Sequence, residues 1–126
     1  LNYPNQLNAT EEEKDWFASL HQTDWSGWHT ITPGFELCKH QMDIQSIDFE
    51  NRFDLIYYDA FAPSAQPELW EEPVMERMQG ALVPGGILVT YCAKGAFKRA
   101  LKGLGFEVET LQGPPGKREM TRAIRV

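Results

Sequence analysis

Apolar side chains occupy both faces of a predicted strand, FDLIYY at Phe53–Tyr58, and this run ends on a carboxylate, Asp59. A strand that is apolar on both faces is typical of the interior of a parallel sheet. Because ligands of open α/β sheets bind beyond the carboxyl ends of the strands, Asp59 is a candidate for contact with a ligand. In the alternative interpretation, Asp59 caps the following turn and Phe61 packs into the core. The two residues alone support both interpretations equally.

Strand-like and helix-like segments alternate after this run. The pattern predicts a helix over 67–82 whose Trp and Met side chains belong to the core, a strand at Ile87–Cys92, a short basic helix over 94–105, and strands over 106–111 and 119–126. Alternation of this kind indicates an α/β sheet with parallel strands and right-handed crossovers. The last two strands are joined by a loop that is too short for a crossover helix, so we expect them to pair antiparallel.

The residues before this run predict a helix and a hairpin. Thr10 and Glu13 have the spacing of a capping box at the start of TEEEKDWFASLHQ. Pro33-Gly34 indicates a turn between two short strands. No linker divides the chain, so we expect a single domain over residues 1–126, with an N-terminal loop and helix over 1–24 and a sheet-forming part over 25–126.

Composition and charge exclude some classes of protein. The chain has no apolar run of the length that a membrane span needs and no basic-then-apolar leader. Cys38 and Cys92 lie in apolar stretches and are expected to be reduced core thiols, which favours a cytoplasmic protein. Residues 1–76 carry a net charge of −12 and residues 77–126 a net charge of +6, so the basic part could meet phosphates, although a solvated surface explains it equally well. The first residue is Leu1, which suggests a piece of a longer protein.

Four short motifs occur in one order: DAFAP at 59–63, PELW at 67–70, LVPGGILVTY at 82–91 and GPPGKREM at 113–120. In this order and spacing the chain resembles, from about Trp25 to its end, the S-adenosylmethionine-dependent methyltransferase domain of the MnmC type. That family methylates the aminomethyl group on the wobble uridine of certain transfer RNAs. The resemblance implies a Rossmann-like class I methyltransferase sheet, with S-adenosylmethionine as cofactor and tRNA as partner.

The resemblance also implies roles for individual residues. Asp59 matches the acid beside the methyl donor and the target amine, and Asp43 in QMDI matches an acid near the adenine of the donor. The cofactor-binding residues are therefore predicted to be Asp43, Asp59 and Ala60. The substrate-binding residues are predicted to be Phe61, Ala62, Pro63, Lys117, Arg118 and Glu119.

The chemistry of methyl transfer suits these residue types. An amine attacks a sulfonium methyl only when its lone pair is available, and a carboxylate can hold an N–H, aim that lone pair and receive the proton. Asp59 is the candidate for this catalytic role, and no metal is required. Phe61 could present a flat face to a base, and Lys117 and Arg118 could contact phosphates. The patch could extend over Lys94, Lys98, Arg99 and Lys102, for which simple solvation is an equal alternative.

The chain departs from a complete class I methyltransferase in one respect. It has no G-x-G between a strand and a helix, the element that holds the donor in such folds. We therefore expect the C-terminal part of a methyltransferase domain, with weak or no donor binding by these 126 residues alone. An exposed strand edge would invite pairing with a second copy, so a homodimer is one expectation. The FAD-dependent oxidase that is sometimes fused to this family would lie beyond Val126.

Other functional classes have less support. A non-catalytic methyltransferase-like module that binds RNA or protein is the main alternative, and a nucleotide-dependent oxidoreductase ranks below it. The histidines lack metal-ligand spacing, and Cys38 with His40 supplies only two ligands, so no metal site is predicted.

Overall fold

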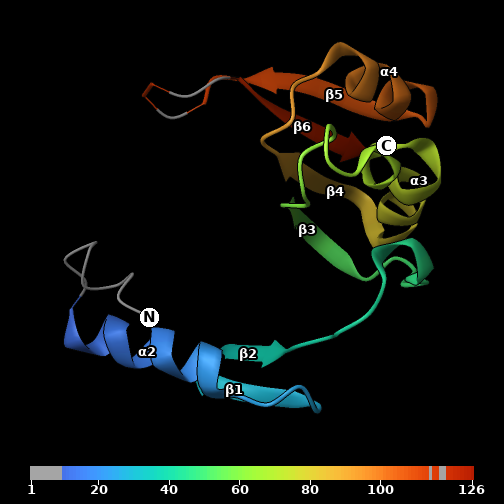
Figure 1. Ribbon diagram of the computed structural model, residues 1–126. Helices are drawn as coiled ribbons and strands as arrows, with labels where there is room; N and C mark the ends of the chain where they lie inside the picture. Colours follow the sequence, from blue (N-terminus) through green and yellow to red (C-terminus); the bar gives the residue numbers. More distant parts are fainter. Residues whose placement is uncertain (1–9, 114, 117–118) are drawn as a thin grey trace. The chain divides into compact units, whose positions relative to one another are not determined.

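The computed structural model describes residues 10–113, 115–116 and 119–126 (Figure 1). They fall into two compact units, one that ends at Met42 (the N-terminal unit) and one over Asp43–Val126 (the C-terminal unit). The single domain expected over residues 1–126 stays a prediction.

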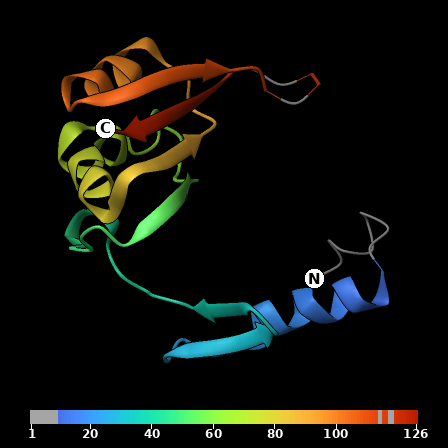
Figure 2. The same cartoon turned by 180° about the vertical axis from the view of Figure 1, so that it is seen from behind.

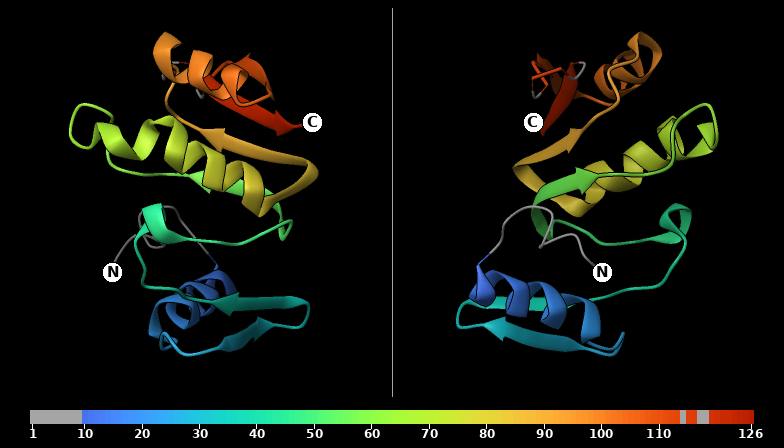
Figure 3. Two further views of the ribbon diagram at one scale, coloured as in Figure 1. Left: turned by 90° about the vertical axis from the view of Figure 1, so that its right-hand side faces the viewer. Right: turned by 60° about the vertical axis from the view of Figure 1, so that its left-hand side comes forward.

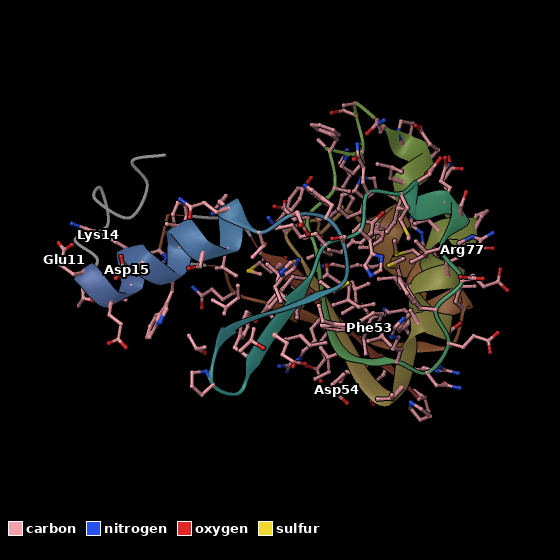
Figure 4. All side chains as sticks on the ribbon, turned by 90° about the horizontal axis from the view of Figure 1, so that it is seen from below. Glu11, Lys14, Asp15, Phe53, Asp54 and Arg77 are labelled. Atoms are coloured by element: carbon pink, nitrogen blue, oxygen red, sulfur yellow. The ribbon has the colours of Figure 1, made fainter. Side chains whose placement is uncertain are left out.

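In the N-terminal unit, one helix is followed by a hairpin. The elements are α2 (Glu11–Gln22), β1 (Trp28–Thr32) and β2 (Phe35–Cys38), and the two strands pair antiparallel. The predicted capping box at Thr10 and Glu13 is present, and a Glu11–Lys14 ion pair of 3.3 Å lies in the first turns of α2 (Figure 4). Gly34, in the hairpin turn, has a φ of +87°, which glycine adopts without strain. Local signals thus determine every element of this unit.

The C-terminal unit is built on a four-stranded sheet. Its elements are the 3₁₀ turns η1 (Ile44–Ser46) and η2 (Pro67–Trp70), the helices α3 (Glu72–Ala81) and α4 (Gly95–Gly103), and the strands β3 (Phe53–Tyr58), β4 (Leu82–Thr90), β5 (Phe106–Leu111) and β6 (Met120–Arg125). The strand order is β3-β4-β6-β5, visible from behind in Figure 2. β3 and β4 are parallel, and β5 and β6 are antiparallel, which confirms the predicted α/β class and the predicted last pair. The last strand, β6, enters between β4 and β5.

Both helices cover the same face of this sheet, and α3 contacts α4 (Figure 3). The core lies between the helices and that face, and it includes Met75, Leu88 and Leu101 with no exposed surface. The Trp and Met side chains predicted for the core, Trp70, Met75 and Met78, are all buried. Burial of a side chain of this size stabilises the fold by about 1.5–3 kcal/mol.

β3 forms an edge of the sheet, because its one neighbour among the described residues is β4. On the face without helices, Leu55 and Tyr57 are 44% and 77% exposed. Apolar character on both faces had suggested an interior strand. Its parallel pairing is as expected. Its position at the edge of the described sheet is not that of an interior strand, and it agrees with the exposed strand edge expected from the sequence.

Two elements differ in their limits from the prediction. The helix expected over 67–82 is divided into η2 and α3, because Pro73 is restricted to the first turn of a helix. β4 begins at Leu82 rather than Ile87 and contains a bulge, since Phe53 pairs with Leu82 but Leu55 pairs with Ile87. Gly86 permits this bulge: a Cβ there would lie 2.8 Å from the carbonyl oxygen of Val83 and 3.1 Å from that of Phe53.

Candidate active site

Three chain segments meet at the carboxyl edge of the sheet. The loop after β3 begins with Asp59, and the loop after β4 begins with Tyr91. Because β3 and β4 are parallel, both loops leave the same edge, and Tyr58 pairs with Thr90 there. β6 runs the other way and starts at this edge, where Thr121 pairs with Thr90. The sheet therefore brings Glu119, next to the start of β6, to the two loops.

A hollow of about 610 Å³ lies between these segments. This volume is within the range of small-molecule sites in proteins. The hollow is lined by Ala62, Pro63, Ser64, Tyr91, Cys92, Ala93, Lys94 and Glu119. Three of the predicted substrate-binding residues, Ala62, Pro63 and Glu119, thus line one cavity, whereas Asp59 and Phe61 are outside its lining.

The side chain of Asp59 is exposed, and its carboxylate has no hydrogen bond or ion pair with another described residue. Its negative charge contributes to the raised pKa of the Tyr91 phenol, after desolvation and Cys92. Phe61 is 73% exposed. The structure therefore shows neither a turn capped by Asp59 nor a Phe61 packed in the core, and both side chains can contact a ligand.

The backbone of this loop is held, although its side chains are exposed. Tyr91 donates its hydroxyl to the carbonyl oxygen of Ala60 at 2.8 Å, and Trp70 donates its indole N–H to the carbonyl oxygen of Phe61 at 2.8 Å. The carbonyl of Ala62 accepts the N–H groups of Ala65 and Gln66. Sequence reasoning missed Tyr91 and Trp70 as site residues. The position of Tyr91 directly after a strand that ends at this edge was the available signal.

Desolvation raises the pKa of both phenols near the site. Burial, followed by the neighbouring Tyr91, raises the pKa of Tyr58 to about 12. Desolvation also raises the pKa of Tyr91, and Cys92 and Asp59 add to the increase because a phenolate would face other negative groups. Both hydroxyls therefore stay protonated, and able to donate hydrogen bonds, to a higher pH than the hydroxyl of an unperturbed tyrosine.

Asp43, predicted near the donor, occupies the N-cap position of η1. Its carboxylate accepts the N–H of Gln45 at 2.9 Å, so one of its oxygens serves a structural role. Lys117 and Arg118 lie outside the described residues.

The cations of α4 differ in their surroundings. Lys98 donates to the Thr110 hydroxyl at 2.7 Å. Lys94, Arg99 and Lys102 are exposed. The basic patch is therefore made of three exposed cations and one that contacts its own protein.

Within the described part of the chain, no three or more His, Cys, Asp or Glu side chains come together as a metal site would need. The Cys38 thiol lies 3.5 Å from the His40 imidazole, and no disulfide is formed. None of the described helices is long and apolar enough to cross a membrane.

Comparison with known proteins shows which family and which proteins the chain is similar to. A family described as S-adenosyl-L-methionine-dependent methyltransferase matches residues 11–126. A tRNA 5-methylaminomethyl-2-thiouridine biosynthesis bifunctional protein, MnmC, from Pseudoalteromonas atlantica is 41% identical over 109 residues, which is 86% of this chain and 13% of the relative. The MnmC protein from Chromobacterium violaceum is 37% identical over 70 residues, which is 56% of this chain and 11% of the relative. The chain thus spans only a small part of these relatives.

Solved structures share the fold. MnmC2 from Aquifex aeolicus matches with a TM-score of 0.66 and 23% identity over 85% of this chain and 34% of that protein. A putative O-methyltransferase from Nostoc punctiforme matches with a TM-score of 0.54 and 11% identity over 70% of this chain and 36% of that protein.

Proposed function

The chain belongs to the family of S-adenosyl-L-methionine-dependent methyltransferases, and from this premise we propose that it forms the acceptor side of a tRNA methyltransferase. The proposed acceptor is the aminomethyl group of the wobble uridine. The observation that carries the proposal is the exposed carboxylate of Asp59 at the carboxyl edge of the sheet, without a partner among the residues that the structure describes. The relatives named for 5-methylaminomethyl-2-thiouridine biosynthesis support the choice of nucleoside.

The described residues suit one side of a site for S-adenosylmethionine. The donor carries a positive sulfonium, and Asp59 offers an uncompensated negative charge. Ala62 and Ala93, which line the hollow, have small side chains and leave its volume open to a ligand. When bound, the donor supplies an electrophilic methyl group. We further propose that these 126 residues alone bind it weakly or not at all, and micromolar affinity in isothermal titration would contradict this.

Asp59 is proposed to orient the acceptor amine and to take its proton. In the transfer, a nitrogen–carbon bond forms as the carbon–sulfur bond breaks, and one N–H proton moves to the carboxylate. The amine must be neutral to attack, and a carboxylate that accepts one N–H also directs the lone pair. The structural requirement is that Asp59 be held in place while its oxygens stay accessible.

The residues around Asp59 are proposed to bind the tRNA. The exposed Phe61 ring can stack on an unpaired base, a common mode of recognising single-stranded RNA. Lys94 lines the hollow and can contact a phosphate. Phosphate contacts of Lys117 and Arg118 stay predictions. A cytoplasmic location follows from a tRNA partner, and fractionation of cells that express the full gene product would test it.

The edge of β3 is proposed to pair with a second copy of the chain, since its outer side has no neighbour in the described sheet and its exposed face carries Leu55 and Tyr57. A purely monomeric chain in sedimentation experiments would contradict this. The relatives' name describes them as bifunctional, which supports a second activity in the parent protein. That this activity is a fused FAD-dependent oxidase stays a prediction.

The function is tested by methyl transfer from labelled S-adenosylmethionine, catalysed by the full gene product. The acceptors are tRNA with an aminomethyl group on the wobble uridine and the same tRNA without it. We expect label only in the first. Asp59→Asn should lower kcat by about 100-fold or more, the magnitude typical of acid–base catalysis. Asp54→Asn is the matched control, because Asp54 is an exposed carboxylate of β3 beside Phe53 (Figure 4), and it should change kcat less than about twofold.

Two results would contradict the proposal. Wild-type protein that binds the tRNA but transfers no methyl group would favour the non-catalytic binding module. An Asp59→Asn variant with wild-type kcat would remove Asp59 from the chemistry, even if methyl transfer is found.

A further inference from the structure

Two consecutive carbonyl groups directly after Asp59 are bound by aromatic side chains from outside the loop. Tyr91 donates to the carbonyl oxygen of Ala60, and Trp70 donates to that of Phe61, each at 2.8 Å. Tyr91 follows β4 and is 31 residues from Ala60, while Trp70 ends η2. The loop is therefore fixed by two independent elements rather than by its own turn alone.

Trp70 is itself fixed by packing, and the ring of Tyr91, which is 45% exposed, packs on it. Trp70 is 5% exposed, and its ring packs edge-to-face on Tyr58, Tyr91 and Phe97, with centroid distances of 5.0, 5.6 and 5.1 Å. Tyr58 also donates its hydroxyl to the carbonyl oxygen of Leu69, next to Trp70. Edge-to-face pairs of this kind add about 0.5–1.5 kcal/mol each beyond their buried area. We call these four aromatic residues, Tyr58, Trp70, Tyr91 and Phe97, the aromatic cluster.

The backbone is held by hydrogen bonds on both sides of Asp59 along the chain. Before Asp59, Tyr58 is fixed by its pairing with Thr90 in β4. After Asp59, the carbonyls of Ala60 and Phe61 are fixed by the aromatic cluster. The Asp59 side chain itself has no such contact with described residues, so its place depends on the backbone beneath it.

We propose that Tyr91 and Trp70 are positioning residues for the methyl transfer, which hold the Asp59 backbone so that its carboxylate meets the acceptor amine. This inference rests on the proposed function. In-line transfer is sensitive to geometry, and a displacement of about 1 Å at the reacting groups can cost about 100-fold in rate. A tyrosine phenol is protonated at neutral pH and can donate this hydrogen bond. Desolvation, Cys92 and Asp59 raise the pKa of Tyr91 further.

The test uses Tyr91→Phe in the full gene product, because this variant removes one hydroxyl and keeps the ring that packs on Trp70. We expect kcat for amine methylation to fall about tenfold, the upper end of the effect of one lost hydrogen bond, with KM for tRNA and donor affinity unchanged. Glu107→Gln is the control, since Glu107 is an exposed residue of β5 at the opposite edge of the sheet and its side chain has no hydrogen bond or ion pair with the described residues. It should leave kcat and KM unchanged.

Hydrogen exchange of the backbone amides of residues 59–66 provides a readout that does not depend on activity. In Tyr91→Phe, exchange should be about threefold to tenfold faster than in Glu107→Gln. Trp70→Phe, which keeps a ring but loses the indole N–H, should show the same change.

The outcomes separate the two proposals. Faster exchange with a lower kcat and an unchanged KM supports positioning. Faster exchange with an unchanged kcat, or unchanged exchange in both variants, overturns it. If wild-type protein transfers no methyl group to either tRNA, the proposed function fails and the positioning role fails with it, whereas the exchange data still decide whether the two donors hold the loop.

Discussion

The two ends of the parallel strand pair β3–β4 treat their polar groups differently. At the end where the strands start, Arg125 donates to the Asn51 side chain at 2.7 Å and to the carbonyl oxygens of Gly80 and Leu82. The N–H groups of Asn51 and Arg52 bind the carbonyls of Gly80 and Ala81, both at 2.8 Å. At this end the charged side chain of Arg125 forms its hydrogen bonds within the fold.

At the end where the strands finish, hydrogen bonds within the fold are made to backbone groups and not to the charged side chains. The carbonyls of Ala60 and Phe61 are bound, but the charged groups of Asp59, Lys94 and Glu119 have no side-chain partner among the described residues. The two ends therefore have different roles. The first end stabilises the sheet, and the second presents charged side chains on a backbone that is held by hydrogen bonds. Substitutions should therefore affect stability at one end and ligand contact at the other.

Replacing Arg125 with Met should give the largest loss of stability among these changes. It removes charge-assisted hydrogen bonds to Asn51 and to two backbone carbonyls, so we expect the free energy of unfolding to fall by about 2 kcal/mol. Urea unfolding measures this. Lys102→Met, at an exposed cation of α4, is the control and should change it by less than about 0.5 kcal/mol. Equal effects of the two variants would show that the hydrogen bonds of Arg125 do not stabilise the fold.

Neutralising the opposite end should leave stability nearly unchanged. Lys94→Gln and Glu119→Gln should each change the free energy of unfolding by less than about 0.5 kcal/mol. Lys94→Gln should weaken tRNA binding about threefold. It should also reduce the slope of log affinity against log salt concentration by about 1, which corresponds to one lost phosphate contact. Lys98→Gln is the control, because Lys98 already binds Thr110, and it should leave the slope as it is. A slope unchanged by Lys94→Gln would show that this end meets no phosphate through that side chain.

High pH should lower the stability of the fold through deprotonation of Tyr58, and this is the smallest of the expected effects. Its pKa is raised by burial and Tyr91 to about 12, above the unfolded value of about 10. A raised pKa of an acid means that the stabilisation is complete below pH ~10 and is lost as the pH rises through the folded value. In a titration followed by tyrosinate absorbance, Tyr58→Phe should lack the step at highest pH. Deprotonation of Tyr58 near pH ~10 in native protein would contradict the burial argument.

Local sequence signals predicted elements wherever neighbours in the chain decide the structure. The capping box at Thr10 and Glu13 and the Pro33-Gly34 turn are both present. The signals were less accurate where distant residues intervene. β4 starts five residues earlier than predicted because its bulge is shaped by the close approach of Phe53 to Gly86, which no local pattern reveals.

For the candidate site, too, local sequence signals predicted some residues, and distant contacts decided the others. The position of Asp59 after an apolar run was sufficient to predict a carboxylate at the carboxyl edge of a sheet, and the motifs from DAFAP to KREM identified the methyltransferase family that the comparison confirms. The residues that hold the loop, Tyr91 and Trp70, were predicted only as parts of motifs or of the core. Their donor role depends on which carbonyls lie opposite them.

The sequence by itself determined the class of fold, the family and the carboxylate that follows β3, because hydrophobic periodicity and short motifs are local properties of the chain. Only the tertiary structure decided that β6 enters between β4 and β5 and that two aromatic side chains bind the carbonyls after Asp59. The reason is physical: strand order and side-chain hydrogen bonds depend on distances between residues far apart in sequence, which are set when the sheet and its covering helices pack.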